Sequence, residues 1–135
     1  MSEIPRIHGV GIDIADAGRI ERLVRTHGDR FARRWFTGEE IVQCNERVDC
    51  AAEYSKRFAA KEAIWKALRL QGWAGPVPWR LISVLRASAL DAVRVELAGD
   101  VERAAARLRV GQIRVDFRTI GPISVAVALV ERDQR

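Results

Sequence analysis

The sequence predicts an α+β domain in which an antiparallel sheet packs against one long helix and several shorter ones. Residues 51–70 contain no Gly or Pro and consist largely of residues that favour the helix. Residues 6–14 end in an alternation of apolar side chains with small or polar ones, as a strand does. Near the end of the chain, a Gly121-Pro122 turn separates two strand-like segments, residues 113–119 and 123–130, which together predict a hairpin.

Shorter elements are predicted between these features. Asp16 is placed to cap a helix that ends at Gly28. The buried side of this helix would hold three apolar residues, Ile20, Leu23 and Val24. A capping box, Thr37-Gly38-Glu39-Glu40, begins another helix. A loop, two strands and an amphipathic helix ended by Gly111 follow at residues 72–78, 82–85, 93–97 and 101–109. No repeat or linker interrupts the sequence, so we expect one domain spanning residues 1–135.

The long helix has an apolar face and a polar stripe. At 100° per residue, the apolar face holds Ala60, Ile64, Ala67 and Leu68. The opposite stripe holds Ser55, Glu62, Lys66 and Arg69. One interpretation is a solvated face with a Glu62–Lys66 pair one helical turn apart. The other interpretation is an acid and a base held in a fixed relation for chemistry.

A second motif, Gly9-Val10-Gly11-Ile12-Asp13-Ile14, bears on that choice. Alternation puts Gly9, Gly11 and Asp13 on one side of a strand, where two absent side chains leave space beside a carboxylate. Glycine in a strand often marks the close approach of a ligand or of another backbone. Asp13 is therefore either the end of an ordinary edge strand or an oxygen ligand for a hard cation. In the second case Glu62 would be the other ligand.

Three blocks of sequence resemble the holo-acyl-carrier-protein synthase family of 4′-phosphopantetheinyl transferases. The first is Gly-Ile-Asp-Ile at residues 11–14 with Arg19-Ile20 after it. The second is Phe31 with Arg-Trp-Phe-Thr-Gly-Glu-Glu at residues 34–40. The third and most specific is Arg-Phe-Ala-Ala-Lys-Glu-Ala at residues 57–63, followed by Lys66-Ala67. Block order and spacing also agree, so the resemblance extends over nearly the whole chain.

The resemblance implies that the chain transfers 4′-phosphopantetheine from coenzyme A to a serine of an apo acyl carrier protein and releases adenosine 3′,5′-bisphosphate. Asp13 and Glu62 would hold Mg²⁺, and Lys66 would neutralise a phosphate. Glu62, or a water that it holds, would take the serine proton. The first helix would dock the carrier through Arg19, with Arg22 and Arg25 beside it.

The residues implied for coenzyme A include a departure from the family pattern. The implied set is Arg57, Lys66, Gly72, Arg118 and Thr119. The family usually carries a His in the penultimate strand, whereas residues 115–119 here read Val-Asp-Phe-Arg-Thr. Arg118 is expected to hold a phosphate in place of that His, because its planar fork grips phosphate. The resemblance also implies a homotrimer with shared active sites, in which Arg57, Arg118 and Thr119 reach coenzyme A bound chiefly by a neighbour. The apolar residues on both faces of segment 123–130 agree with that.

Composition is compatible with this interpretation. A net charge of +5 and a pI near 10 favour acidic partners, and both an acyl carrier protein and coenzyme A are acidic. The basic residues form no compact tract, so we expect no nucleic-acid partner, and the apolar runs are too short for a membrane span. Two cysteines without a metal-binding pattern favour a cytoplasmic location. A non-catalytic, carrier-binding relative and a basic nucleic-acid-binding domain stay as alternatives.

Overall fold

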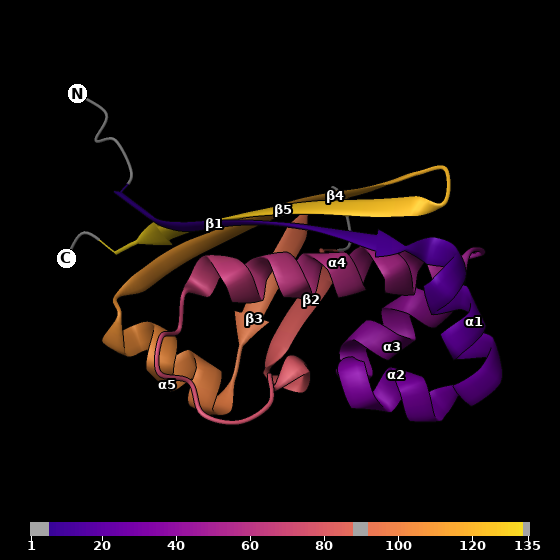
Figure 1. The fold of residues 1–135 in the computed structure, drawn as a ribbon, viewed down its shortest axis with the longest axis horizontal. Helices are drawn as coiled ribbons and strands as arrows, with labels where there is room; N and C mark the ends of the chain where they lie inside the picture. The colour runs from indigo at the N-terminus through magenta and orange to yellow at the C-terminus, as the bar shows by residue number, and fades with distance from the viewer. Residues whose placement is uncertain (1–5, 88–91, 134–135) are drawn as a thin grey trace.

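A computed structural model describes residues 6–87 and 92–133 of the chain. The long helix α4 (Cys50–Leu68) lies beneath a three-stranded antiparallel sheet ordered β1-β5-β4 (Figure 1). The strands of that sheet are β1 (Arg6–Asp16), β5 (Ile123–Arg132) and β4 (Val110–Ile120). A second, two-stranded antiparallel sheet pairs β2 (Ile82–Arg86) with β3 (Val93–Leu97). The predicted α+β class, with antiparallel strands around a long helix, is confirmed.

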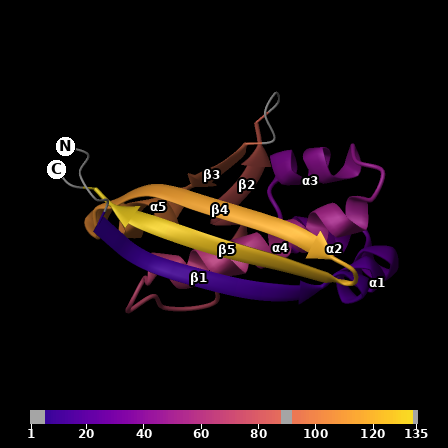
Figure 2. The ribbon, with the colours of Figure 1, turned by 90° about the horizontal axis from the view of Figure 1, so that it is seen from above.

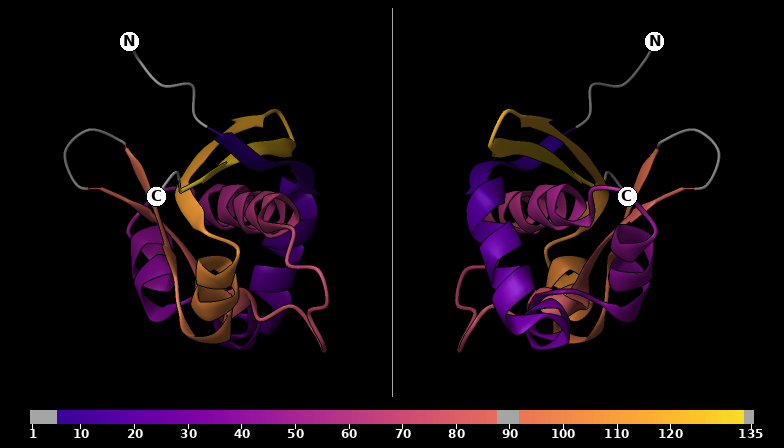
Figure 3. Two further views of the ribbon diagram at one scale, coloured as in Figure 1. Left: turned by 90° about the vertical axis from the view of Figure 1, so that its left-hand side faces the viewer. Right: turned by 90° about the vertical axis from the view of Figure 1, so that its right-hand side faces the viewer.

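The remaining helices lie at the two ends of α4. Helices α1 (Ala17–His27), α2 (Asp29–Trp35) and α3 (Gly38–Asn45) gather near its N-terminal half (Figure 1). The short helix η1 (Trp79–Leu81) and α5 (Gly99–Arg107) follow later in the chain. Viewed from the ends, the large sheet, α4 and a lower layer of helices and strands form three layers (Figure 3). None of the helices in the described part of the chain is long and apolar enough to cross a membrane.

The predicted caps form as expected. The Asp16 carboxylate accepts hydrogen bonds from the backbone N–H groups of Gly18 and Arg19, and α1 ends at Gly28. The Thr37 hydroxyl accepts from the Glu40 N–H, while the Glu40 carboxylate accepts from the Thr37 N–H. These side chains bond to backbone groups that a helix leaves unsatisfied, which is why they fix its starting point.

Other boundaries differ from the prediction. Helix α2 and η1 were not predicted, and α4 ends at Leu68 because Arg69 adopts the left-handed conformation. Gly111 does not end α5: it lies inside β4, and the positive φ of 58° belongs to Arg109. Both helix ends therefore use an arginine in a conformation that glycine adopts more readily.

Helix α4 packs closely against β1. A Cβ atom at Gly9 would lie 2.0 Å from the Ala67 carbonyl oxygen, and one at Gly11 would lie 1.9 Å from that of Ala63. The two glycines therefore serve the approach of another backbone, not the approach of a ligand. Below β1, the predicted apolar face of α4 is fully buried. Ser55 is also fully buried, so its predicted place on a solvated stripe was wrong.

The outer face of the large sheet is apolar along β1 and β5. Val10, Ile12 and Ile14 are 55–63% exposed, and Val127 is 44% exposed. Strand register sets Ile12 opposite Val127 and Ile14 opposite Val125 on this face. From above, no helix or strand of the described chain covers it (Figure 2). Within one chain, β5 is therefore buried on one face only.

Candidate active site

Asp13 and Glu62, predicted from separate motifs, come together where β1 crosses α4. The Asp13 side chain is 12% exposed, and its Oδ1 accepts a hydrogen bond from Lys66 Nζ at 2.9 Å. Lys66 Nζ also donates to the Ile12 carbonyl oxygen at 3.1 Å, which fixes it at the edge of β1. Lys66 thus pairs with Asp13, not with Glu62 as the solvated-face interpretation required. The other Asp13 oxygen, Oδ2, is buried without a hydrogen-bond partner.

Glu62 has an unusual proton affinity for a carboxyl group. Burial, and then a hydrogen bond and the negative charge of Asp13, raise the pKa of Glu62 from 4.5 to about 7. The positive charges of Lys66 and Arg19 act in the opposite direction. Two carboxyls that share one small site do not both ionise easily. A proton or a cation between them relieves the repulsion, so the pair is a candidate binding site for a cation.

A cavity of about 890 Å³ opens beside Glu62, between α1, α2 and the middle of α4. Its apolar lining comes from Ile14, Ala15, Ile20, Leu23, Phe31, Trp35 and Phe58. Its basic lining comes from Arg19, His27, Arg30 and Arg34. A ligand with apolar and acidic groups fits such a lining, and Glu62 lies where it could reach a group of that ligand.

The three arginines predicted for carrier docking have different positions. Arg19 lines the cavity, one turn after the cap of α1. Arg22 and Arg25 are exposed on the same helix, and Arg25 forms an ion pair with Glu21. Arg30 and Arg34 line the cavity, although they were not among the predicted docking residues. Their helix α2 is only seven residues long and gave no clear periodic pattern.

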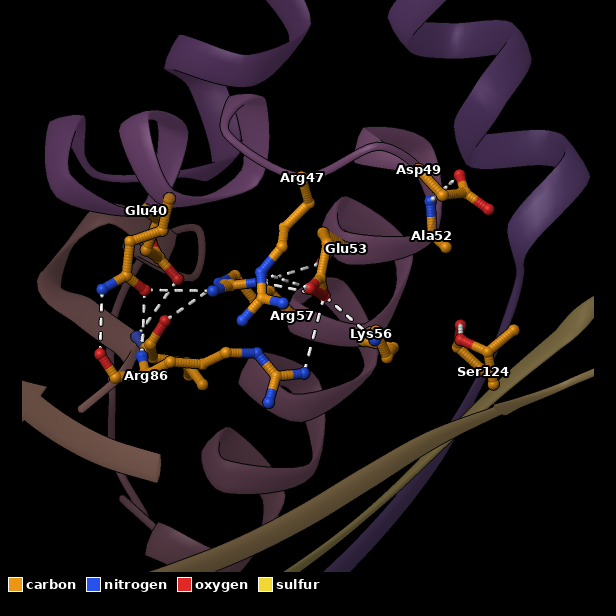
Figure 4. A network of polar contacts seen from close by, with 12 residues as sticks. Glu40, Arg47, Asp49, Ala52, Glu53, Lys56, Arg57, Arg86 and Ser124 are labelled. Carbon is orange, nitrogen blue, oxygen red and sulfur yellow. Dashed lines mark hydrogen bonds and ion pairs between the residues drawn. The ribbon is translucent and has the colours of Figure 1, made fainter. Parts of the chain in front are cut away.

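Arg57, which the resemblance places among the coenzyme A residues, is buried within its own chain. Its side chain is 1% exposed and donates to the Val84 carbonyl oxygen, to Glu53 and to Gln43 Oε1. Figure 4 shows Arg57 at the centre of a network that joins α3, α4 and β2. The Nε, Nη1 and Nη2 atoms of Arg57 thus all bond to acceptors of its own chain. A contact between Arg57 and coenzyme A stays a prediction.

Lys61, the residue before Glu62, is a buried cation for which the sequence predicted no role. Lys61 Nζ is 2.6 Å from Glu40 Oε1, and the two side chains are 2% and 0% exposed. Lys61 also donates to the Trp35 carbonyl oxygen at 2.7 Å, at the end of α2. Burial lowers the pKa of Lys61, while the charge and hydrogen bond of Glu40 oppose that change. Lys61 therefore ties the cavity wall and α3 to the helix that carries Glu62.

The other residues predicted for coenzyme A lie apart from the carboxylates. Arg118 is 79% exposed, on the outer face of β4, with Asp116 at 3.9 Å. Thr119 is on the opposite face, where its hydroxyl contacts Ser124 at 3.2 Å. Gly72 lies in the turn after α4 with a φ of 80°. Arg118 thus faces away from the Asp13 side of its own sheet.

Comparison with known proteins assigns this fold and site to a class. The sequence model of the 4′-phosphopantetheinyl transferase superfamily matches residues 9–127. The chain therefore belongs to this superfamily of enzymes. Its relatives include holo-[acyl-carrier-protein] synthases of Methylobacterium radiotolerans, 35% identical over 93% of both chains, and of a Chelativorans species. The Chelativorans protein is 37% identical, over 93% of this chain and 96% of its own. Within the superfamily, the resemblance to holo-[acyl-carrier-protein] synthases is confirmed.

Solved structures of holo-[acyl-carrier-protein] synthases have the same fold as this chain. The holo-[acyl-carrier-protein] synthase of Neisseria meningitidis superimposes with a TM-score of 0.82 at 28% identity, covering 93% of this chain and 99% of that one. The Helicobacter pylori enzyme, solved in complex with coenzyme A, gives a TM-score of 0.75 at 25% identity. That match covers 90% of this chain and 98% of the other. The fold is thus shared along almost the full length of these enzymes.

Proposed function

We propose that this protein transfers 4′-phosphopantetheine from coenzyme A to a serine of an apo acyl carrier protein. The observation that carries the proposal is the Asp13–Glu62 pair, with Lys66 on one side and the arginine-lined cavity on the other. In the reaction, the serine Oγ forms a bond to the β-phosphorus of coenzyme A. The bond from that phosphorus to the bridging oxygen breaks, and adenosine 3′,5′-bisphosphate leaves.

The carboxylate pair fits Mg²⁺. Asp13 Oδ2 is a buried oxygen without a hydrogen-bond partner, and burial, followed by the hydrogen bond and charge of Asp13, raises the pKa of Glu62. No group of three or more acidic, His or Cys ligands occurs in the described chain, and Mg²⁺ commonly needs only one or two carboxylates beside water and phosphate oxygens. Asp13 and Glu62 would hold the ion. When bound, it would neutralise charge that develops on the phosphate oxygens.

The protein side chains have separate parts in this reaction. Lys66, 54% exposed and anchored to β1, is free to extend its remaining donor to a phosphate oxygen. Glu62 takes the proton from serine Oγ, directly or through a water that it holds. Glu62 lies at the junction of the cavity and the carboxylate pair, so a serine presented through the cavity comes within its reach.

The partners follow from charge and from the exposed sheet. Arg19, with Arg22 and Arg25 on the same helix, would dock an acidic carrier protein. Arg118 would contact a phosphate of coenzyme A bound chiefly by a neighbouring subunit, because it faces outward from its own sheet. We therefore infer a homotrimer whose subunits cover the apolar face of β1 and β5. A cytoplasmic location agrees with the free thiols of Cys44 and Cys50.

The decisive experiment is single-turnover transfer to a panel of apo carrier proteins, with Mg²⁺ and with a chelator. We expect a mass increase of one phosphopantetheine on the carrier only when Mg²⁺ is present, and none with the Asp13→Asn variant. The panel also tells whether fatty-acid or polyketide carriers are preferred. Binding of a carrier without any transfer would instead identify a non-catalytic relative. Binding to nucleic acid that falls steeply with salt would support the third alternative.

A further inference from the structure

Lys66 places a positive charge beside the carboxylate pair. Its Nζ lies 2.9 Å from Asp13 Oδ1 and 3.1 Å from the Ile12 carbonyl oxygen, so two of the three ammonium donors are directed at β1. The Asp13 side chain is only 12% exposed, which limits the screening of this ion pair by water. The charge of Lys66 also opposes the rise in the pKa of Glu62. In the chain alone, Lys66 therefore acts as the counter-ion of both carboxylates.

The two oxygens of Asp13 have different surroundings. Oδ1 accepts from Lys66, whereas Oδ2 is buried and has no hydrogen-bond partner in the described part of the chain. Any divalent cation ligated by Asp13 would share this carboxylate with the ammonium group of Lys66. Like charges at such short range repel strongly where water is scarce. The ion pair that balances the charge of Asp13 therefore also weakens it as a ligand.

Of the two partners in this ion pair, the lysine is the one that can move. Its side chain is 54% exposed, whereas Asp13 belongs to a strand that Gly11 sets directly against the backbone of α4. Lysine carries a compact charge on a flexible four-carbon stem, so Nζ can leave Oδ1 without any movement of the helix. A phosphate oxygen on the exposed side would offer Nζ another negatively charged acceptor.

We propose that Lys66 competes with the divalent cation for Asp13 and is drawn away from Asp13 when a phosphate of coenzyme A binds its ammonium group. This inference rests on the proposed function for the identity of the phosphate. The cation affinity of the chain alone then stays low, and the substrate raises it. Linkage makes the effect reciprocal, so the cation strengthens the binding of coenzyme A by the same factor. Lys66 thus reserves the carboxylate pair for a cation that arrives together with substrate.

A different role for Lys66 would be to orient Asp13 for the cation, and the two roles predict opposite results. Removing an orienting hydrogen bond would weaken cation binding, whereas removing a competing charge strengthens it. The charge should be the larger effect, because a divalent ion is repelled twice as strongly as a monovalent one. Orientation depends on one hydrogen bond to a residue whose strand is already fixed against α4.

Lys66→Met removes the charge and keeps an unbranched side chain, so it tests the competition directly. Mn²⁺ followed by electron paramagnetic resonance is the probe, since Mn²⁺ takes the same oxygen ligands as Mg²⁺. Without coenzyme A, the variant should bind Mn²⁺ about tenfold more tightly than the wild type does. Saturating coenzyme A should tighten Mn²⁺ binding by a larger factor in the wild type than in the variant. No carrier protein is present, so the readout is independent of transfer.

Lys56→Met is the matched control. Lys56 is another lysine of α4, and its Nζ lies 3.0 Å from Glu53 Oε2, so the variant removes the same charge from the same helix. It should leave Mn²⁺ binding unchanged with and without coenzyme A. Lys66→Gln is a second neutral variant that should behave as Lys66→Met does. Thermal melts check that all three variants are folded, and a titration in buffer corrects for Mn²⁺ held by free coenzyme A.

Weaker Mn²⁺ binding by both Lys66 variants would overturn the inference and assign Lys66 to the orientation of Asp13. Unchanged Mn²⁺ binding, or an equal effect of coenzyme A on wild type and variants, would overturn it as well. Failure of the proposed function is a separate result. If Mn²⁺ and coenzyme A bind as expected but no carrier accepts phosphopantetheine, the transferase function fails and the competition stands. If transfer occurs while the variants bind Mn²⁺ as the wild type does, the function stands and the competition is excluded.

Discussion

Glu62 lies against Asp13 with a pKa near 7, and this pKa links its protonation to folding. The folded chain holds a proton on Glu62 between about pH 4.5 and 7, whereas the unfolded chain releases it near pH 4.5. The free energy of unfolding without a cation should therefore decrease as pH rises through this window. Replacing Glu62 by Gln should stabilise the cation-free protein at pH 8 by on the order of 1 kcal/mol, allowing for solvent screening.

Thermal melts of the wild type and Glu62→Gln in chelator, at pH 5 and pH 8, measure this difference. The melting temperature of Glu62→Gln should exceed that of the wild type at pH 8 and differ little from it at pH 5. Glu39→Gln is a suitable control, since Glu39 is exposed in the first turn of α3. Equal melting temperatures of Glu62→Gln and wild type at pH 8 would contradict the raised pKa.

The same pKa predicts how activity depends on pH and Mg²⁺. A proton on Glu62 competes with the cation, so the rate at limiting Mg²⁺ should rise as pH passes through about 7. More Mg²⁺ should move the midpoint to lower pH, because the cation favours the ionised carboxylate. Rate profiles at two Mg²⁺ concentrations measure the shift. A midpoint pH that does not change with the Mg²⁺ concentration would show that Glu62 does not bind the cation.

Arg118 should matter for substrate binding more than for the rate. Arg118→Ala should raise the coenzyme A concentration at half-maximal rate several-fold and change the maximal rate less, because it removes a phosphate contact but no ligand of the cation. The loss should be the same from pH 6 to pH 9, since a guanidinium stays charged. Asp13→Asn should instead lower the rate even at saturating coenzyme A. An unchanged titration for Arg118→Ala would exclude the contact.

At the scale of the elements, side chains of α3 and α4 complete the free edge of β2. Gln43 accepts from the Arg86 N–H and donates to the Arg86 carbonyl, while Glu40 accepts from the Val84 N–H. Arg57 donates to the Val84 carbonyl. Four backbone groups of the edge are thus bonded by side chains, as a neighbouring strand would bond them (Figure 4). This arrangement leaves the edge closed to pairing with another chain.

Lys61 carries the connection between α2, α3 and α4, and its removal should be costly. Lys61→Met leaves Glu40 buried without its cation, which should lower the free energy of unfolding by about 3–5 kcal/mol. The double variant Glu40→Gln, Lys61→Met buries no uncompensated charge and should recover part of that loss. Urea denaturation of both variants measures the difference. A double variant less stable than Lys61→Met alone would contradict this account.

The elements show which parts of the fold could be predicted from sequence. The starts of α1 and α3 were predicted because Asp16, Thr37 and Glu40 act on neighbours in the sequence. Helix α2 was not predicted, because it is short and rich in arginine. The burial of Lys61 on α4 was not predicted either, since it depends on contacts with α2 and α3, which come from another part of the chain. Helical periodicity marks one buried face, whereas α4 is surrounded by other elements.

At the scale of the whole molecule, the apolar face of β1 and β5 should control assembly. Ile12→Lys places a charge in the centre of this face and should reduce the trimer mass in light scattering, together with activity. Val48→Lys is the matched control, because Val48 is fully exposed outside the face. A wild-type monomer at micromolar concentration with full activity would contradict the shared site.

Only those residues of the candidate site that belong to a local sequence pattern could be predicted. Asp13 and Glu62 were identified because each belongs to a distinctive local pattern, and the structure brings them together. The positions of Arg57 and Arg69 were not predictable in the same way. Arg57 donates a hydrogen bond to the edge of β2, and Arg69 has the left-handed backbone conformation that glycine usually adopts. Whether an arginine meets a ligand or its own chain depends on tertiary packing, which a motif does not contain.

The glycines of β1 have a consequence for affinity. With no side chain at Gly9 or Gly11, the strand lies directly on the backbone of α4, and neither element can slide without breaking that contact. The distance between Asp13 and Glu62 is therefore set when the chain folds, before any ion arrives. The entropy of bringing two carboxylates together is lost during folding and does not weaken the binding of the cation. A scaffold of two glycines thus preorganises a centre that has only two protein ligands.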